Sequence, residues 1–324
     1  MKPLILVHGG AGAMRSMDGE RAAAYRAGLV EAARVGRELL AAGGSALDAV
    51  VVATRVMEAS GAFNAGVGSC LDAEGRYSLD AALMDGRERR AGALGAVTAT
   101  AHPIDAARAL LDEGRHVLLV GPGADRWIAG LELPPLPEPP ADKLAHYEEL
   151  LAKQAARQRA LDLADMTSVG RPDDEEAPDL GHDTVGAVAL DAEGGLAAAV
   201  STGGLWLKAP GRVGDSALVG AGLFACETLG AAAVSTGIGE RMIRDLTCHR
   251  ACQLSQELGA QEGAEGCVAE LDQRFGPDSG GVIVVDAQGL AGASFNTQGM
   301  GRALARVGEE EIPVAVWPED DFPL

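Results

Sequence analysis

Three loops rich in hydroxyl and glycine residues follow predicted strands in the second half of the chain. Their sequences are STGG at 201–204, GRVGDS at 211–216 and STGIGE at 235–240. Each loop alone fits an ordinary glycine turn or the start of a helix. Together they offer hydroxyls, an arginine, an aspartate and helix-start amides at the ends of neighbouring strands. Such a set can bind a small zwitterion and stabilise a developing oxyanion.

A further hydroxyl, that of Thr184, lies where the character of the chain changes abruptly. The stretch RPDDEEAPDL at 171–180 has the composition of a disordered, exposed segment. The segment TVGAVAL at 184–190 has the small and β-branched residues of a buried strand. Threonine is also common at strand starts, so the position alone does not separate a structural role from a chemical one.

Several familiar catalytic motifs are missing from the sequence. No G-x-G-x-x-G follows the first predicted strand and no G-K-[ST] occurs, so neither dinucleotide binding nor a P-loop is indicated. HGGAG at 8–12 is similar to an esterase oxyanion loop, but no G-x-S-x-G elbow accompanies it. Cys248, His249 and Cys252 offer part of a zinc site, without a second pair to complete it.

Composition narrows the class of protein. The 324 residues include 27 Lys and Arg against 47 Asp and Glu, a formal net charge of −20 that disfavours nucleic acid and anionic membranes as partners. The apolar run near the start is too short for a signal peptide, and none reaches the roughly 18 residues of a membrane span. Five irregularly spaced cysteines suit reduced thiols. The sequence therefore predicts a cytoplasmic protein.

Helical and strand patterns alternate along the chain. We expect strands at 4–7, 76–86, 91–100, 116–120, 215–225 and 231–236, hairpins at 184–204 and 280–296, and helices at 19–42, 45–57, 103–113, 141–165, 238–258 and 263–275. HGGAGA at 8–13 is predicted to be a turn. A proline-rich stretch at 131–140 begins an exposed linker. The hairpins imply antiparallel pairing, so a layered α/β fold fits better than a doubly wound parallel sheet.

The chain resembles the plant-type L-asparaginase and isoaspartyl peptidase family of N-terminal nucleophile hydrolases. The matching stretches follow the family order, and only the linker at about 131–180 has no counterpart of fixed sequence. They are HGGAGA (8–13), GGSALDAVVVATRVME (43–58), FNAGVGS (63–69), AALMDG (81–86), TVGAVALDAEGGLAAAVSTGG (184–204), GRVGDSALVGAG (211–222), STGIGE (235–240) and FNTQGMGRA (295–303). The resemblance implies a four-layer αββα sandwich with mostly antiparallel sheets.

By the same resemblance the chain cuts itself between Asp183 and Thr184. The products would be an α chain, 1–183, whose tail is the exposed linker of about 131–183, and a β chain, 184–324, in one folded domain. A free α-amino group has a pKa near ~8, so the amine of Thr184 can accept the proton of its own hydroxyl. Nucleophile and base would then reside on one residue.

The resemblance also implies a role for each polar residue of the site. The catalytic residues would be Thr184, Thr202, Thr236 and Gly237, and the substrate-binding residues Asn64, Arg212, Asp215, Gly237 and Gly239. Thr202 would hydrogen-bond the nucleophile, and the Thr236 hydroxyl with the Gly237 N–H would form the oxyanion hole. Arg212 would grip the substrate α-carboxylate with its guanidinium fork, and Asp215 would pair with the α-ammonium.

No cofactor for catalysis is implied, but a loop at about 57–67 is similar to one that binds a structural sodium ion through backbone carbonyls. The corresponding carbonyls belong to Met57, Glu58, Ser60, Phe63, Ala65 and Val67. The expected partners are a small amino-acid or dipeptide substrate and a second copy, as a dimer of αβ units. Nucleic acid and membranes are not expected partners.

The sequence does not distinguish between several possible substrates. GHD before Thr184 is similar to the cleavage site of glycosylasparaginases, whereas the α-chain motifs favour the asparaginase branch. Ser294 and Gly301 replace a proline and an aromatic residue common in that branch, which would loosen a pocket wall. We therefore expect hydrolysis of L-asparagine, of β-aspartyl dipeptides or of both. The alternatives are a glycosylasparaginase and a non-catalytic protein that binds a small molecule or a metal.

Overall fold

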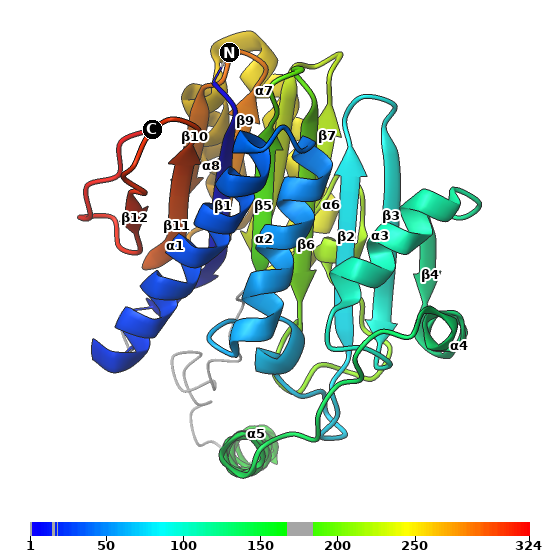
Figure 1. The fold of residues 1–324 in the computed structure, drawn as a ribbon. Coiled ribbons are helices and arrows are strands. Elements are labelled where there is room, and N and C mark those ends of the chain that lie inside the picture. Colours follow the sequence, from blue (N-terminus) through cyan, green and yellow to red (C-terminus); the bar gives the residue numbers. More distant parts are fainter. Residues whose placement is uncertain (1, 15–16, 18, 167–183) are drawn as a thin grey trace.

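The computed structural model describes residues 2–14, 17, 19–166 and 184–324 of the continuous chain. Two sheets dominate its α/β architecture (Figure 1). The eight-stranded sheet has the order β12-β11-β1-β5-β6-β2-β3-β4, and the four-stranded sheet the order β10-β9-β8-β7. The strands are β1 (Leu4–Gly12), β2 (Leu79–Asp85), β3 (Arg90–Val97), β4 (Leu118–Val120), β5 (Val185–Leu190), β6 (Leu196–Thr202), β7 (Leu223–Cys226), β8 (Ala231–Gly237), β9 (Gly280–Asp286), β10 (Ala291–Phe295), β11 (Gly299–Arg306) and β12 (Val314–Ala315).

Neighbouring strands among the described residues run antiparallel, except that β3 and β4 are parallel. Helices α1 (Gly19–Ala41), α2 (Ala46–Ser60) and α3 (Pro103–Glu113) pack on one face of the eight-stranded sheet, while α7 (Thr247–Leu258) and α8 (Ala260–Phe275) pack on the four-stranded sheet. The two sheets face each other, because β1 and β5 of one contact β8 and β9 of the other.

Strand β5 is buried at every position and carries only apolar residues and glycine. Val185 and Ala187 belong to the hydrophobic cluster beneath α1–α3, and Val188 and Leu190 belong to the cluster that the second sheet shares. Successive side chains of a strand point to opposite faces, so a strand buried on both faces needs apolar residues at every position. The hairpin predicted at 184–204 is confirmed as β5 and β6.

Local signals also position the helices as expected. Ser45 caps α2 by accepting the Asp48 N–H at 3.1 Å, and α2 ends at Ser60, just before Gly61, whose φ of 71° suits glycine. Helix α3 begins with Pro103 and covers the predicted 103–113. The five cysteines are free and buried. No helix in the described part of the chain is long and apolar enough to cross a bilayer.

Three expectations about the elements are wrong. HGGAG does not turn, because β1 continues to Gly12 through a shift in its register with β11 between His8 and Gly10. The helix predicted at 238–258 is interrupted at Leu246, whose φ of 51° separates α6 (Gly239–Asp245) from α7. The segment 215–225 is a 3₁₀ turn followed by β7, and β7 belongs to the second sheet.

The linker is only partly as predicted. The polar helix expected at 141–165 is confirmed as α5 (Ala141–Met166), which lies beyond one end of the strands (Figure 1). Its first half is not fully exposed, since Leu150 is 3% accessible. The acidic stretch and the predicted cleavage site at Asp183 lie outside the described residues.

Candidate active site

Thr184 lies at the start of β5, against the end of β6. Its side chain is buried, and its hydroxyl donates a hydrogen bond to Thr202 Oγ1 at 3.2 Å. The pairing of Val185 with Ser201 brings the two threonines opposite each other. Thr202 Oγ1 also accepts the Gly204 N–H at 3.0 Å. The nucleophile proposed from the sequence is thus held by a second hydroxyl that the backbone fixes in place.

A small cavity adjoins this pair of hydroxyls. Its volume is about 10 Å³, enough for about one water molecule. The lining residues are Thr184, Thr202, Gly204, Leu205, Arg212, Asp215 and Gly237. Five of the residues predicted from the sequence therefore meet at one point in the fold, although they come from four separate loops and strands.

The end of β8 contributes Thr236 and Gly237. The Thr236 hydroxyl is buried and has no hydrogen-bond partner among the described residues. A buried hydroxyl without a partner is costly, and a ligand oxygen would satisfy it. Gly237 has φ 136°, and a Cβ there would lie 2.3 Å from the Ser279 carbonyl oxygen, so only glycine fits. Thr236 itself does not line the cavity, whereas Gly237 does.

Arg212 is placed as predicted, but its fork is occupied. Its Nε and Nη2 atoms each donate to the Glu240 carboxylate at 3.0 Å. Nη1 instead faces Gly204, where an added Cβ would lie 3.1 Å from it. The Nε–Nη2 edge is thus paired with Glu240 in the continuous chain, and Nη1 faces a glycine that lines the cavity, while the grip on a substrate carboxylate stays a prediction.

Sequence reasoning missed Glu240. The available signal was an acidic residue at the end of STGIGE, where a helix begins. Glu240 lies in the first turn of α6 and pairs with Arg212 of the 211–216 loop. A bidentate carboxylate contact fixes the plane of a guanidinium group. Glu240 therefore sets which way Arg212 points.

Asp215 is a buried carboxylate beside Arg212. Burial raises its pKa to about 6, against the opposing effect of the Arg212 charge. It accepts a hydrogen bond from the Ser235 hydroxyl at 3.2 Å. Gly239 packs on it, since a Cβ at Gly239 would lie 2.7 Å from Asp215 Oδ1. The absence of a side chain at Gly239 thus leaves this carboxylate approachable.

A second buried aspartate, Asp80, anchors the loop that carries Arg212 and Asp215. Its two oxygens accept the N–H groups of Gly214 and Ala96, each at 2.8 Å. Asp80 was also missed, because nothing in AALMDG or the residues before it distinguishes one strand aspartate from another.

Asn64 lies behind the cavity and does not line it. Its Nδ2 donates to the Gly204 carbonyl at 2.7 Å, and its carbonyl accepts the Gly203 N–H at 2.9 Å. Its Oδ1 accepts the Cys70 N–H at 2.9 Å. These contacts support the expectation from the family resemblance that Asn64 helps position the nucleophile, while substrate binding by Asn64 stays a prediction.

His8 lies close to the nucleophile strand without offering a base. Burial lowers its pKa to about 3, which keeps the ring neutral at pH 7. A Cβ at Gly186 would lie 2.4 Å from His8 Nε2. No histidine lines the cavity in the part of the chain that the structure describes, so a Ser-His-Asp type of triad is not assembled there.

Hydrogen bonds reach several carbonyls of the loop predicted to bind sodium. Four of the six carbonyls already accept a donor: Met57 from the Ser60 hydroxyl, Phe63 from the Ala65 N–H, Ala65 from the Gly68 N–H, and Val67 from both Lys143 and Tyr77. Lys143 Nζ also brings a positive charge to within 3.1 Å of the Val67 carbonyl. A carbonyl oxygen has two lone pairs, so an accepted hydrogen bond does not by itself exclude a cation, and the sodium site stays a prediction.

In the part of the chain that the structure describes, the residues of the metal-binding alternative do not come together as a metal site. Cys248 and Cys252 lie on the buried face of α7, and burial raises the pKa of both thiols. The His249 ring packs edge-on against Phe224, with ring centroids 4.9 Å apart. No group of three or more metal-ligating side chains occurs among the described residues.

Comparisons with known proteins agree with this geometry. The family model described as Asparaginase matches residues 1–313. An isoaspartyl peptidase of Salmonella typhimurium is 41% identical over 312 residues, covering 95% of this chain and 96% of that protein. A plant-type L-asparaginase of Pyrobaculum calidifontis is 42% identical over 314 residues, covering 94% and 97%. An isoaspartyl peptidase/L-asparaginase of Xenopus laevis is 36% identical over 318 residues, covering 98% and 96%. The chain therefore belongs to the asparaginase family of hydrolases.

Proposed function

We propose that this chain is a self-processing amidohydrolase in a four-layer αββα sandwich of the N-terminal nucleophile type. It cleaves the side-chain amide of L-asparagine, the isopeptide bond of β-aspartyl dipeptides, or both. The observation that carries the proposal is the hydrogen-bonded pair of Thr184 and Thr202, set in a cavity with one cation, Arg212, and one buried carboxylate, Asp215. The names of the relatives, isoaspartyl peptidase and L-asparaginase, support it.

Processing would begin with attack of Thr184 Oγ1 on the Asp183 carbonyl carbon. The C–N bond breaks, the threonine nitrogen takes the proton, and an ester joins Asp183 to the Thr184 side chain. Water then hydrolyses this ester, giving the α chain 1–183 and the β chain 184–324. Since the cavity in the continuous chain admits about one water molecule, substrate would enter only after cleavage.

Turnover uses the same hydroxyl with its new amine. The neutral α-amino group of Thr184 takes the hydroxyl proton, and Oγ1 attacks the substrate β-carbonyl. The partnerless Thr236 hydroxyl and the Gly237 N–H would stabilise the oxyanion. Ammonia or an amino acid leaves with the proton, and water hydrolyses the β-aspartyl ester.

The two charged groups would recognise the aspartyl part of the substrate. Asp215, once ionised, pairs with the α-ammonium, and Arg212 Nη1 contacts the α-carboxylate. The 16% exposure of the Arg212 side chain allows such contact while shielding it from bulk water. Both groups recognise features common to asparagine and β-aspartyl dipeptides, so they do not distinguish the two substrates.

A substrate panel on purified, matured protein tests the proposal. L-Asparagine and β-Asp-Leu should be hydrolysed, and GlcNAc-Asn should be cleaved much more slowly or not at all. Faster cleavage of GlcNAc-Asn would favour the glycosylasparaginase alternative. Light scattering on the same sample tests the expected dimer of αβ units.

A further inference from the structure

Helix α5 docks on the main body through one face of its first half. Lys143, His146, Tyr147 and Leu150 have the i, i+3, i+4, i+7 spacing of a single helix face. The Tyr147 hydroxyl donates to the Ala73 carbonyl at 3.1 Å, and the His146 ring packs edge-on against Trp206 at 5.0 Å. The segment expected to be a solvent-exposed tail is therefore attached beside the candidate site.

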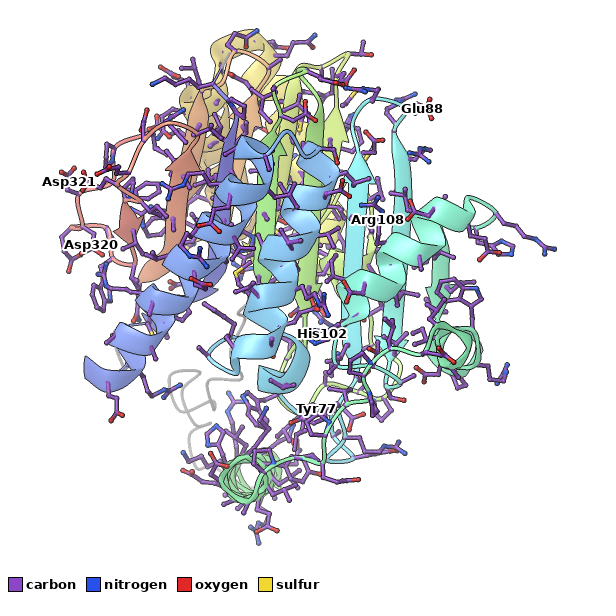
Figure 2. All side chains as sticks on the ribbon, in the orientation of Figure 1. Tyr77, Glu88, His102, Arg108, Asp320 and Asp321 are labelled. Atoms are coloured by element: carbon purple, nitrogen blue, oxygen red, sulfur yellow. The ribbon has the colours of Figure 1, made fainter. Side chains whose placement is uncertain are left out.

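Lys143 makes the strongest of these contacts. Its ammonium donates to the carbonyls of Ser69 at 2.6 Å and Val67 at 3.1 Å, and lies 4.9 Å from the centre of the Tyr77 ring. Tyr77 lies between the strand ends and α5 (Figure 2) and itself donates to the Val67 carbonyl at 3.3 Å. An ammonium that bonds two carbonyls and packs on a ring brings a fixed positive charge to this segment.

The segment that Lys143 holds leads directly to the cavity. Cys70, next to Ser69, donates its N–H to Asn64 and its thiol to the Gly203 carbonyl at 3.4 Å. Asn64 in turn bonds both Gly203 and Gly204. Gly204 lines the cavity and donates to Thr202 Oγ1. An unbroken series of contacts thus connects α5 to the hydroxyl that orients Thr184.

We propose that Lys143 is a positioning residue, whose ammonium serves as a built-in cation that fastens segment 64–70 and, through Asn64 and Gly204, the Thr184–Thr202 pair. Helix α5 would then remain a working part of the site after cleavage before Thr184, although it belongs to the tail of the α chain. This inference rests on the proposed function for its kinetic consequence, but its structural consequence is independent of activity.

Hydrogen–deuterium exchange on the full chain at pH 7 tests the fastening directly. Burial lowers the pKa of Lys143 to about 8, so the ammonium form dominates at that pH. Lys143→Met keeps the aliphatic stem and removes the charge, and should speed exchange of peptides within 64–73 by about ten- to hundredfold. Lys143→Arg should restore near wild-type exchange. Lys153→Met is the matched control, because Lys153 is exposed on the same helix and pairs only with Glu149 among the described residues.

Kinetics on the matured variants provide the second readout. Lys143→Met should lower kcat about tenfold with KM changed less than about twofold, because Asp80 holds the loop of Arg212 and Asp215 independently of α5. A loss of general stability would instead speed exchange equally in the distant hairpin β9–β10. That uniform result, or unchanged exchange at 64–73, would overturn the proposal.

A comparison of exchange in sodium chloride and in choline chloride distinguishes fastening by Lys143 from fastening by a bound sodium ion. Wild-type exchange at 64–73 should be the same in both salts. Strong protection of the wild type by sodium alone would show that an ion fastens the segment, and would also overturn the proposal. If the wild type lacked amidase activity altogether, the proposed function would fail while the exchange data still decided the role of Lys143.

Discussion

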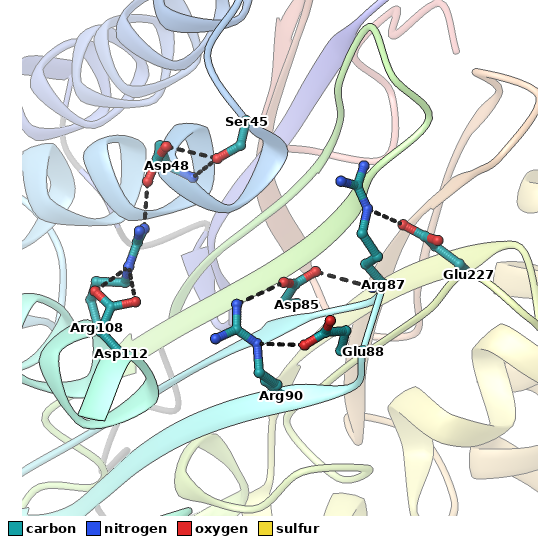
Figure 3. Close-up of polar contacts among 9 residues, drawn as sticks. All are labelled: Ser45, Asp48, Asp85, Arg87, Glu88, Arg90, Arg108, Asp112 and Glu227. Carbon is teal, nitrogen blue, oxygen red and sulfur yellow. Dashed lines mark hydrogen bonds and ion pairs between the residues drawn. The ribbon is translucent and has the colours of Figure 1, made fainter. Parts of the chain in front are cut away.

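Strand β2 has an aspartate at each end, and the two carboxylates have opposite surroundings. Asp80, at the end beside the candidate site, is fully buried and accepts two backbone N–H groups at 2.8 Å. Asp85, at the far end, is only partly buried; it accepts the backbone N–H of Arg87 at 3.0 Å and pairs with the Arg90 side chain at 3.4 Å (Figure 3). Two backbone donors, one on each oxygen, restrict the Asp80 carboxylate more than one backbone donor and a flexible arginine restrict Asp85. The site end is therefore built for fixed geometry.

The far end of β2 is surrounded by ion pairs between side chains. Around Asp85 the ion pairs of Figure 3 join long side chains, such as Arg87 with Glu227 at 3.4 Å and Arg108 with Asp112 at 2.9 Å. Exposed pairs of this kind contribute about 0–1 kcal/mol each and weaken with salt. At the site end, the hydroxyls of Thr184 and Thr202 and the Asp215 carboxylate are buried and hydrogen-bonded to groups that are themselves buried. Substitutions at the site end should therefore change activity, whereas those at the far end should change only stability, and by little.

The largest effect should come from Thr184→Ala. Without the hydroxyl neither the acyl shift nor substrate attack can occur, so activity should fall by about 10⁴-fold or more. Stopped assays with L-asparagine measure it, and circular dichroism checks folding. Turnover within tenfold of the wild type would place the nucleophile elsewhere.

Removal of the proposed oxyanion donor should have the next largest effect. Thr236→Val should lower kcat about 10²–10³-fold. The matched control is Thr54→Val in α2, because Thr54 also has a buried hydroxyl without a partner in the described structure. Equal activity of the two variants would mean that Thr236 is simply a core residue.

Asp215 should impose a pH dependence. Because substrate binding needs the carboxylate, kcat/KM should fall about tenfold per pH unit below its pKa of about 6. The contribution of Asp215 to folding stability should change with pH in the opposite direction. Burial raises this pKa above that of an unfolded aspartate, near ~4, so its stabilising contribution is present below pH 4 and lost as pH rises through 6. Asp215→Asn should remove the pH dependence of kcat/KM and that of the free energy of unfolding. Denaturant unfolding of this variant from pH 4 to 7 measures the second, and a slope equal to that of the wild type would contradict the assignment.

Glu240→Gln should raise KM about tenfold with little change in kcat, since a neutral amide orients the Arg212 guanidinium less firmly. Glu270→Gln is the control, because Glu270 forms a similar fork with Arg250 at 2.8 and 2.6 Å on helices α7 and α8. A fall in KM would instead mean that Glu240 competes with the substrate for Arg212.

The smallest effects belong to the far end. Glu227→Gln and Arg90→Ala should each change the free energy of unfolding by less than about 1 kcal/mol and leave kcat/KM unchanged. A change in activity from either variant would show that the two ends of β2 are coupled.

Much of this organisation could be predicted from the sequence. Local signals placed α3 and the hairpin of β5 and β6 correctly, because caps and apolar alternation act over a few residues. Family motifs named the five residues that meet at the cavity. The break at Leu246 escaped prediction, because a left-handed conformation is one that leucine does not favour and its side chain therefore gives no signal of it.

The contacts between distant segments were also beyond local reasoning. The bond from Glu240 to Arg212 depends on how α6 meets the 211–216 loop. The docking of Lys143 depends on carbonyl groups some 74 residues away in the chain, and carbonyls leave no mark in the side-chain pattern.

The central claim is that Thr184 becomes the first residue of a separate chain. Intact-mass spectrometry of the purified wild type under denaturing conditions, followed over time, tests it most directly. We predict two fragments that meet between Asp183 and Thr184, with a free α-amine on Thr184, and a single uncut chain for Thr184→Ala. A wild type that retained its full mass through long incubation while it hydrolysed L-asparagine would contradict the account.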